Sequence, residues 1–98
     1  MNIQIKLVKE CSKGEYGTCE VTSVNSILIE ISKKRNVNNL EYFCTLLHEL
    51  LHAWIFIMKA NGIKIGLIKE HKWIYNVQAV IFEALKLINK NTRFKRKI

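Results

Sequence analysis

Three residues near the middle of the chain have types and spacing that could do chemistry: His48, Glu49 and His52, within TLLHELLHAW at residues 45–54. On a helix, residues four apart project from one face, so His48 and His52 can each place a ring nitrogen about 2 Å from a single metal ion. Glu49 lies about 100° further round the helix axis, where its carboxylate reaches a metal-activated water rather than the metal. The pattern predicts two metal ligands and a general base for attack on a carbonyl group.

The alternative is that these three side chains are ordinary helix residues, each satisfied by a local partner. All other residues of the stretch are apolar or small. Burying two imidazoles and a carboxylate in such surroundings costs free energy unless something compensates for it. We therefore expect a bound cation to stabilise the trio.

A catalytic zinc ion needs a third protein ligand and one position left open for water. The chain contains no aspartate and one further histidine, His71, which lies beyond a glycine-containing turn. Two antiparallel helices joined by this turn would bring His71 back beside the first two histidines. We expect His71 to be the third ligand, and Glu70 and Glu83 remain alternatives; otherwise His71 is a solvated residue in the first turn of a helix.

The elements that must position these residues can be predicted from periodicity. Residues 2–9 alternate apolar and polar side chains, which predicts a strand with one buried face. The apolar residues of that face are Ile3, Ile5 and Leu7. Residues 19–24 read as the returning strand after a glycine-containing turn, and residues 26–32 as a third strand. The sheet is therefore expected to be three-stranded and mainly antiparallel.

Two helices should follow the strands. Residues 40–60 contain no helix breaker and are apolar nearly all round, which predicts a central helix that begins after Asn38 or Asn39. Asn61 and Gly62 provide its C-terminal cap. A second helix is predicted over residues 71–89, with apolar residues at steps of three and four. The predicted fold class is α+β, with a small sheet packed on two helices of which the first carries the H-E-x-x-H motif.

Three aromatic residues near the motif have simple structural interpretations. We expect Trp54 and Trp73 to belong to the core rather than to a cleft. Tyr75 follows His71 by one helical turn. It either packs or stays at the surface, or it points its phenol at a developing oxyanion.

The charge of the chain is strongly unbalanced. Sixteen lysines and arginines face eight acids, giving a formal net charge of +8. The last nine residues, 90–98, hold five positive charges and no negative one. This end is either a solvated terminus or a basic arm that binds the phosphate backbone of a nucleic acid. We predict a single domain over residues 1–90 and a basic tail over residues 91–98.

The cysteines and the apolar segments indicate a cytoplasmic protein. Cys11, Cys19 and Cys44 make an odd number, and residues 1–10 lack the apolar core of a signal peptide. We expect free thiols; a Cys11–Cys19 disulfide across a hairpin, or zinc ligation by that pair, are the alternatives. The apolar run over residues 46–58 is too short for a membrane span and contains charged and polar groups.

The segments HELLHAW and KEHKWIY resemble the SprT-like zinc metallopeptidases and the small zincins encoded by phages and mobile elements. The resemblance covers roughly residues 26–85. It implies Zn²⁺ bound by His48, His52 and His71, Glu49 as the base, and a polypeptide substrate. It also implies that residues 26–32 form the strand along which the substrate backbone pairs. The chain departs from the larger members in size, because it lacks their C-terminal zinc ribbon and long substrate domain.

Other interpretations remain open on the sequence. A second resemblance, to minimal gluzincins of the ImmA/IrrE type, would move the third ligand to a glutamate. The chain could instead be a non-catalytic, zinc-stabilised DNA-binding or regulatory module of a phage or mobile element, which would not need Glu49. A small toxin or phage accessory protein that uses metal only to fold is a third possibility.

Overall fold

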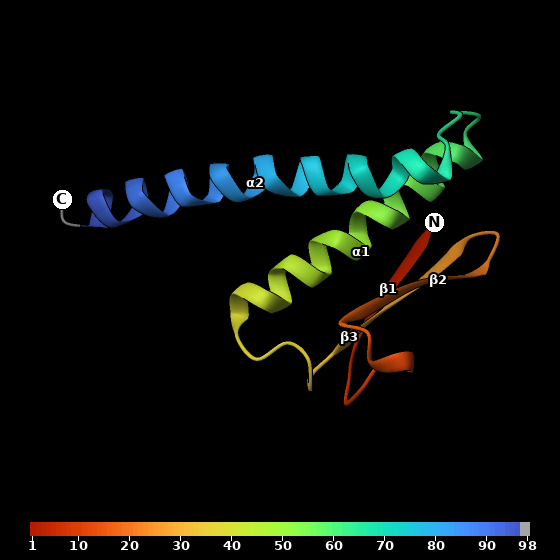
Figure 1. Ribbon diagram of the computed structural model, residues 1–98, viewed down its shortest axis with the longest axis horizontal. Coiled ribbons are helices and arrows are strands. Elements are labelled where there is room, and N and C mark those ends of the chain that lie inside the picture. The colour runs from red at the N-terminus through yellow and green to blue at the C-terminus, as the bar shows by residue number, and fades with distance from the viewer. Residues whose placement is uncertain (97–98) are drawn as a thin grey trace.

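The computed structural model describes the backbone of residues 1–96, and the side chains of residues 67, 68 and 89–96 lie outside that description. Three strands precede two helices, which confirms the α+β class (Figure 1). The elements in chain order are β1 (Asn2–Val8), a short 3-10 turn (Ser12–Gly14), β2 (Gly17–Ser23), β3 (Ser26–Ser32), α1 (Asn39–Ala60) and α2 (Leu67–Arg96).

The last strand in the chain is the central strand of the sheet. β3 pairs antiparallel with β2 through a tight turn and parallel with β1, so the order is β1-β3-β2 and the sheet is mixed rather than mainly antiparallel. The prediction that the second strand returns beside the first is therefore wrong, and Cys11 and Cys19 do not face each other across a hairpin. Alternating side chains define the buried face of a strand but not its neighbour, so the sequence pattern could not reveal this order.

α1 is the middle layer of the molecule. On one side, Ala53 packs with the fully buried side chains of β3, which are Ile27, Ile29 and Ile31. On the other side, Leu51 and Ile55 pack against Ile74 of α2. Because the sheet and α2 cover opposite sides of α1, this helix needs apolar residues nearly all round its axis.

β1 lies beyond the reach of α1. Ile3, Ile5 and Leu7 pair in register with the buried residues of β3 and share their face, yet they remain 39%, 48% and 58% exposed. α1 contacts β2 and β3 but not β1 within the described part of the chain. The predicted burial of this face is therefore wrong, because the covering helix crosses the other two strands.

The ends of α1 follow the predicted chemistry. The Asn38 side chain accepts a hydrogen bond from the Glu41 backbone N–H at 2.9 Å. At the other end Gly62 has a φ of +88°, and the Ile63 N–H donates to the Met58 carbonyl at 3.1 Å. This is the Schellman arrangement, which favours glycine because a side chain would be strained there.

α2 is longer than predicted at both ends. It begins at Leu67 instead of residue 71 and continues to Arg96, through the boundary predicted between the domain and the tail. Its C-terminal half projects beyond the other elements (Figure 1). The side chains of the predicted basic tail, residues 91–98, lie outside the described residues, so its contact with nucleic acid stays a prediction.

Trp54 does not belong to the core. It is 50% exposed, and its ring centroid lies 5.4 Å from that of Trp73 in an edge-to-face arrangement. Such a pair is favourable even where one ring faces water. The prediction of burial holds better for Trp73, which is partly buried against the cluster around Ile74.

α1 is long and apolar enough, by length and composition alone, to cross a membrane. In the structure it occupies the layer between the sheet and α2 and carries the buried residues Leu51, Ala53 and Ile55. The buried share of its most apolar stretch is 22%. A cytoplasmic location and the absence of a membrane partner stay predictions.

Candidate metal centre

The structure brings the three histidines together. His48 and His52 lie on successive turns of α1, and His71 lies in the first turns of α2, which the cap at Gly62 directs back across α1. One ligand nitrogen from each ring lies within 4.8 Å of the other two. The Nε2 atoms of His48 and His52 are 3.2 Å apart, close to the roughly 3.3 Å separating two nitrogens on one tetrahedral zinc ion. The longer nitrogen–nitrogen distances among the three histidines are therefore those that involve His71, which is the exposed one of the three. The three histidines could hold a metal ion.

Each histidine of α1 is oriented by a polar side chain from α2. The Nδ1 of His52 lies 2.7 Å from Oε2 of Glu70, whose other oxygen accepts from Lys59 at 3.2 Å. The Nδ1 of His48 lies 3.0 Å from Oε1 of Gln78. A metal-bound histidine usually donates its second ring N–H to such an acceptor, which fixes its tautomer and its orientation.

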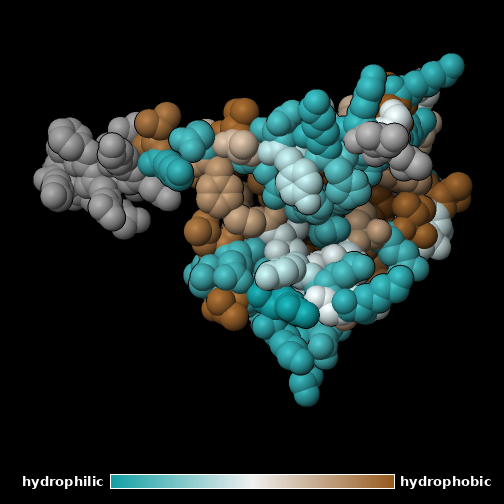
Figure 2. Space-filling view, viewed as in Figure 1, coloured by the Kyte–Doolittle hydropathy of each residue, from teal (hydrophilic) through white to brown (hydrophobic). Residues whose placement is uncertain are grey.

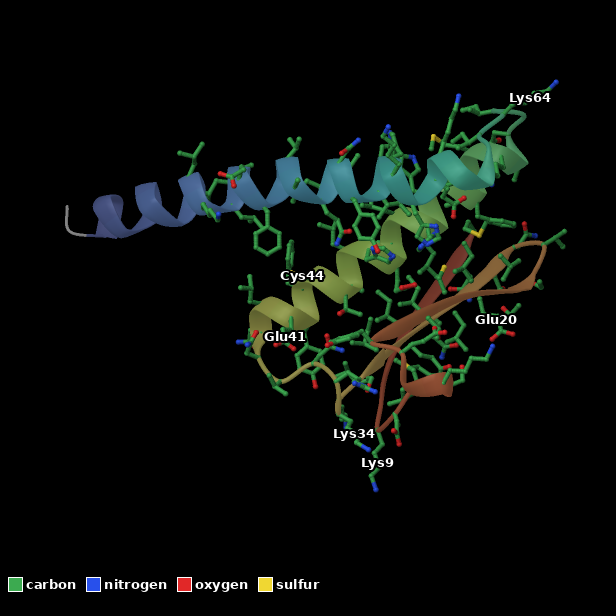
Figure 3. All side chains as sticks on the ribbon, viewed as in Figure 1. Lys9, Glu20, Lys34, Glu41, Cys44 and Lys64 are labelled. Atoms are coloured by element: carbon green, nitrogen blue, oxygen red, sulfur yellow. The ribbon has the colours of Figure 1, made fainter. Side chains whose placement is uncertain are left out.

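The amide of Gln78 is itself oriented by α1. Its Nε2 donates to the Cys44 carbonyl at 3.3 Å, which leaves Oε1 directed at His48. Cys44 lies on the part of α1 that faces α2 (Figure 3). Because both acceptors face Nδ1, the proton of each ring belongs on Nδ1, and both Nε2 atoms carry bare lone pairs.

These lone pairs face each other. Two unprotonated Nε2 atoms at 3.2 Å repel unless a cation lies between or beside them. Burial lowers the pKa of His52, against the opposing effect of its hydrogen bond to Glu70, and so disfavours a proton on that ring. The donor set therefore fits a divalent metal ion that prefers imidazole nitrogen.

Glu49 is the buried carboxyl group of the site. It is 7% exposed and lines the cleft beside the histidines. Its burial raises its pKa to about 7, and the nearby charge of Glu15 adds to the shift, whereas His71 opposes it. A carboxyl group with a pKa near neutrality can accept a proton at one step and return it at the next.

The wall opposite the helices is the start of β2. A Cβ on Gly17 would lie 2.6 Å from Cγ2 of Thr45 and 3.2 Å from Cγ of Glu49, so only glycine lets this strand approach α1 so closely. The fully buried Asn36 holds the segment in place. Its Nδ2 donates to the Tyr16 carbonyl at 3.0 Å, and its Oδ1 accepts from the Thr45 hydroxyl at 2.6 Å.

α1, α2 and β2 form the walls of a cleft of about 550 Å³ that is open to solvent. Hydrophilic side chains gather where the helices and the sheet meet, and hydrophobic ones over the start of α1 (Figure 2). Tyr75 lines the cleft, 61% exposed, with its ring centroid 5.5 Å from that of His48. A role for its phenol at an oxyanion stays a prediction.

The other candidate ligands lie differently. Glu70 uses both carboxylate oxygens, one toward His52 and one toward Lys59. Burial opposes its ionisation, but these two hydrogen bonds outweigh it and lower its pKa. Glu83 lies farther along α2 and pairs with Lys86 at 3.3 Å. Within the described part of the chain, the histidine triad is the one cluster suited to a metal, and the thiol of Cys19 lies outside it with its pKa raised by burial to about 11.

Two contributors to the site were not identified from the sequence. Gln78 lies seven residues after His71 and three after Tyr75, so the three side chains form one polar stripe on α2. This polar stripe could have identified Gln78 as part of the site from the sequence. The position of Glu15 in the cleft wall depends on how the loop before β2 folds back, which no local pattern encodes.

Removing an orienting group should weaken metal binding without removing a ligand. We expect Gln78→Leu to raise the Kd for zinc about 10- to 100-fold, because His48 loses its Nδ1 acceptor. Gln78→Glu keeps an acceptor there and should stay within a few fold of the wild type. Competition with a chromophoric chelator measures these values, and Glu83→Gln on the same helix is the matched control. Equal affinity for Gln78→Leu and the control would contradict the orienting role.

Comparison of the chain with protein-family models, with curated proteins and with solved structures finds no match in any of the three. The likeness to SprT-like metallopeptidases and other small zincins therefore stays a prediction from the two sequence motifs, and the functional argument depends on the geometry of the site.

Proposed function

We propose that the protein is a zinc-dependent metallopeptidase in which His48, His52 and His71 bind the metal and Glu49 activates water. One observation carries the proposal: two orienting acceptors on α2 leave the Nε2 lone pairs of His48 and His52 directed at each other, 3.2 Å apart. This arrangement suits a divalent cation. The buried carboxyl group of Glu49 lies beside the histidines. A catalytic role accounts for this carboxyl group, whereas a purely structural metal site would not need it.

The roles of the protein groups follow from their positions. When bound, zinc would polarise the scissile carbonyl and make a water molecule acidic near neutral pH. Glu49 would take the proton of that water as it attacks the carbonyl carbon, and would then pass the proton to the departing amine. Glu70 and Gln78 would hold the rings of His52 and His48 in their binding orientation throughout.

The strand available to a substrate is β2 rather than β3. The resemblance to small zincins implied pairing along residues 26–32, but β3 is hydrogen-bonded to a neighbour on both sides. β2 is an edge strand, and its first residues line the cleft next to Glu49. We therefore place an extended polypeptide along the outer edge of β2, where its backbone can form main-chain hydrogen bonds.

The test starts from the zinc content of purified protein. We expect one zinc ion per chain and slow cleavage of an unfolded protein or a peptide mixture, detected by mass spectrometry of new termini. A chelator should stop the cleavage, and added zinc should restore it. Stoichiometric zinc without any cleavage would contradict the peptidase and favour the non-catalytic, zinc-stabilised module.

A further inference from the structure

Glu15 lies where two hollows of the surface join. The cleft at the histidines and a second hollow along β2 are both lined by Glu15, Gly17, Glu49 and His52. The second hollow continues past Cys19 to Val21 and is closed on the helix side by apolar and polar residues, Phe56, Lys59 and Glu70. The two hollows therefore form one groove that follows the outer side of β2 past Glu49.

The three carboxyl groups of this groove differ in how their charge is compensated. Glu70 is paired with Lys59 and hydrogen-bonded to His52. Glu49 is buried, with only 7% of its surface exposed, so it presents little of its carboxyl group to the open groove. Glu15 is exposed, and its side chain makes no ion pair or hydrogen bond with other described residues. In a chain with a net charge of +8, the groove thus has one negative group without a cationic partner.

The backbone places Glu15 in line with the rest of the groove. Glu15 has extended dihedral angles, φ −72° and ψ 154°, and β2 begins two residues later. In an extended segment, alternate residues share a face, so Glu15, Gly17, Cys19 and Val21 face the same side. A peptide paired with this edge would meet first a carboxylate, then the flat surface of a glycine beside Glu49, and then an apolar hollow.

We propose that Glu15 selects peptides with a lysine or arginine side chain beside the scissile bond, and that the hollow at Cys19, Val21 and Phe56 takes an apolar side chain about four to six positions away. The proposal rests on the proposed function, because it assigns a substrate class to the same site. The positive charge that Glu15 recognises belongs to an internal side chain of the peptide rather than to its free amino terminus, since the groove continues on both sides of Glu15.

Binding to a zinc-loaded Glu49→Gln variant tests the selectivity without requiring turnover. Fluorescently labelled peptides are matched in length and differ in one position, which is lysine, glutamine or glutamate. We expect the lysine peptide to bind about three- to tenfold more tightly than the glutamine peptide. Glu15→Gln should remove this preference, and Glu15→Lys should make the glutamate peptide the preferred ligand. Both variants change an exposed side chain, so folding should be unaffected.

Glu20→Lys is the matched control. Glu20 is an exposed residue of β2, five residues after Glu15, and its side chain points away from α1 (Figure 3). This variant makes the same change in net charge outside the groove, and the preference for lysine should survive it. A preference that Glu15→Lys leaves unchanged, or that Glu20→Lys removes equally, would overturn the proposal. So would a failure of every peptide to bind.

Acetylation of the peptide terminus distinguishes the two sources of positive charge. If the site holds an internal side chain, acetylated and free peptides should bind alike; tight binding of free termini alone would overturn that assignment. Failure of the assignment of Glu15 can also be distinguished from failure of the proposed function. Binding with a Glu15-dependent preference, combined with no cleavage by the wild-type protein, would reject hydrolysis and leave the assignment of Glu15 standing.

Discussion

Glu49→Gln should lower the rate of peptide hydrolysis by the zinc-loaded protein about 10²- to 10⁴-fold, while the zinc content stays at the wild-type value. Glutamine has nearly the shape of glutamate but cannot accept the proton of the attacking water. Because Glu49 is not among the three clustered ligand residues, the metal should remain bound. Rates are measured from the appearance of new peptide termini, and zinc is measured by elemental analysis of the same samples.

Stability provides the control for this substitution. The folded pKa of Glu49, about 7, lies above its ordinary value of 4.5, so the metal-free protein loses stability as pH rises through this interval. Glutamine does not ionise, so metal-free Glu49→Gln should be more stable than the wild type at pH 8 by about 3 kcal/mol. Below pH 4 this difference should vanish. A variant that is less stable at pH 8 would show that its inactivity reflects damage to the fold.

Removing the metal should lower the Tm by more than about 10 °C. A ligand present at about 1,000 times its Kd stabilises the folded state by about 4 kcal/mol, and each kcal/mol corresponds to about 4–8 °C for a domain of this size. The ligands come from both helices, so the ion would hold α1 and α2 together. Thermal unfolding with and without a chelator, followed by circular dichroism, measures the shift.

His71→Ala is the sharpest variant for this second prediction. His71 is exposed, so its truncation should leave the Tm of the metal-free protein nearly unchanged. The increase on adding zinc should be largely lost. Glu83→Ala, an exposed substitution on the same helix, should keep the full increase. If the chelator leaves the wild-type Tm unchanged, a tightly bound metal is contradicted.

The sequence predicted the parts of the site that local spacing controls. The steps from His48 to His52 place both rings on one face of a helix, Asn38 and Gly62 mark its ends, and the tight connection returns His71 to the same place. Each of these depends on a few neighbouring residues. The positions of Gln78 and Glu15 depend on the crossing of α1 and α2 and on a loop conformation, which are set by tertiary packing.

Strand order was the main failure, and it had a physical reason. An alternating segment such as residues 2–9 indicates which side chains share a face, but any strand of similar length could serve as its neighbour. The same limit explains why the burial of Ile3 was predicted wrongly. Its face was identified correctly, but the coverage of that face depends on where α1 crosses the sheet.

The central place of β3 also constrains the order in which the chain can fold. β2 and β3 are joined by a short turn and can form a hairpin with little loss of loop entropy. β1 has no partner until β3 exists, and its pairing joins residues about as far apart as Asn2 and Ser26. During synthesis, β1 leaves the ribosome before β3 and therefore waits unpaired for it, and the β2–β3 hairpin is the natural nucleus onto which β1 later adds.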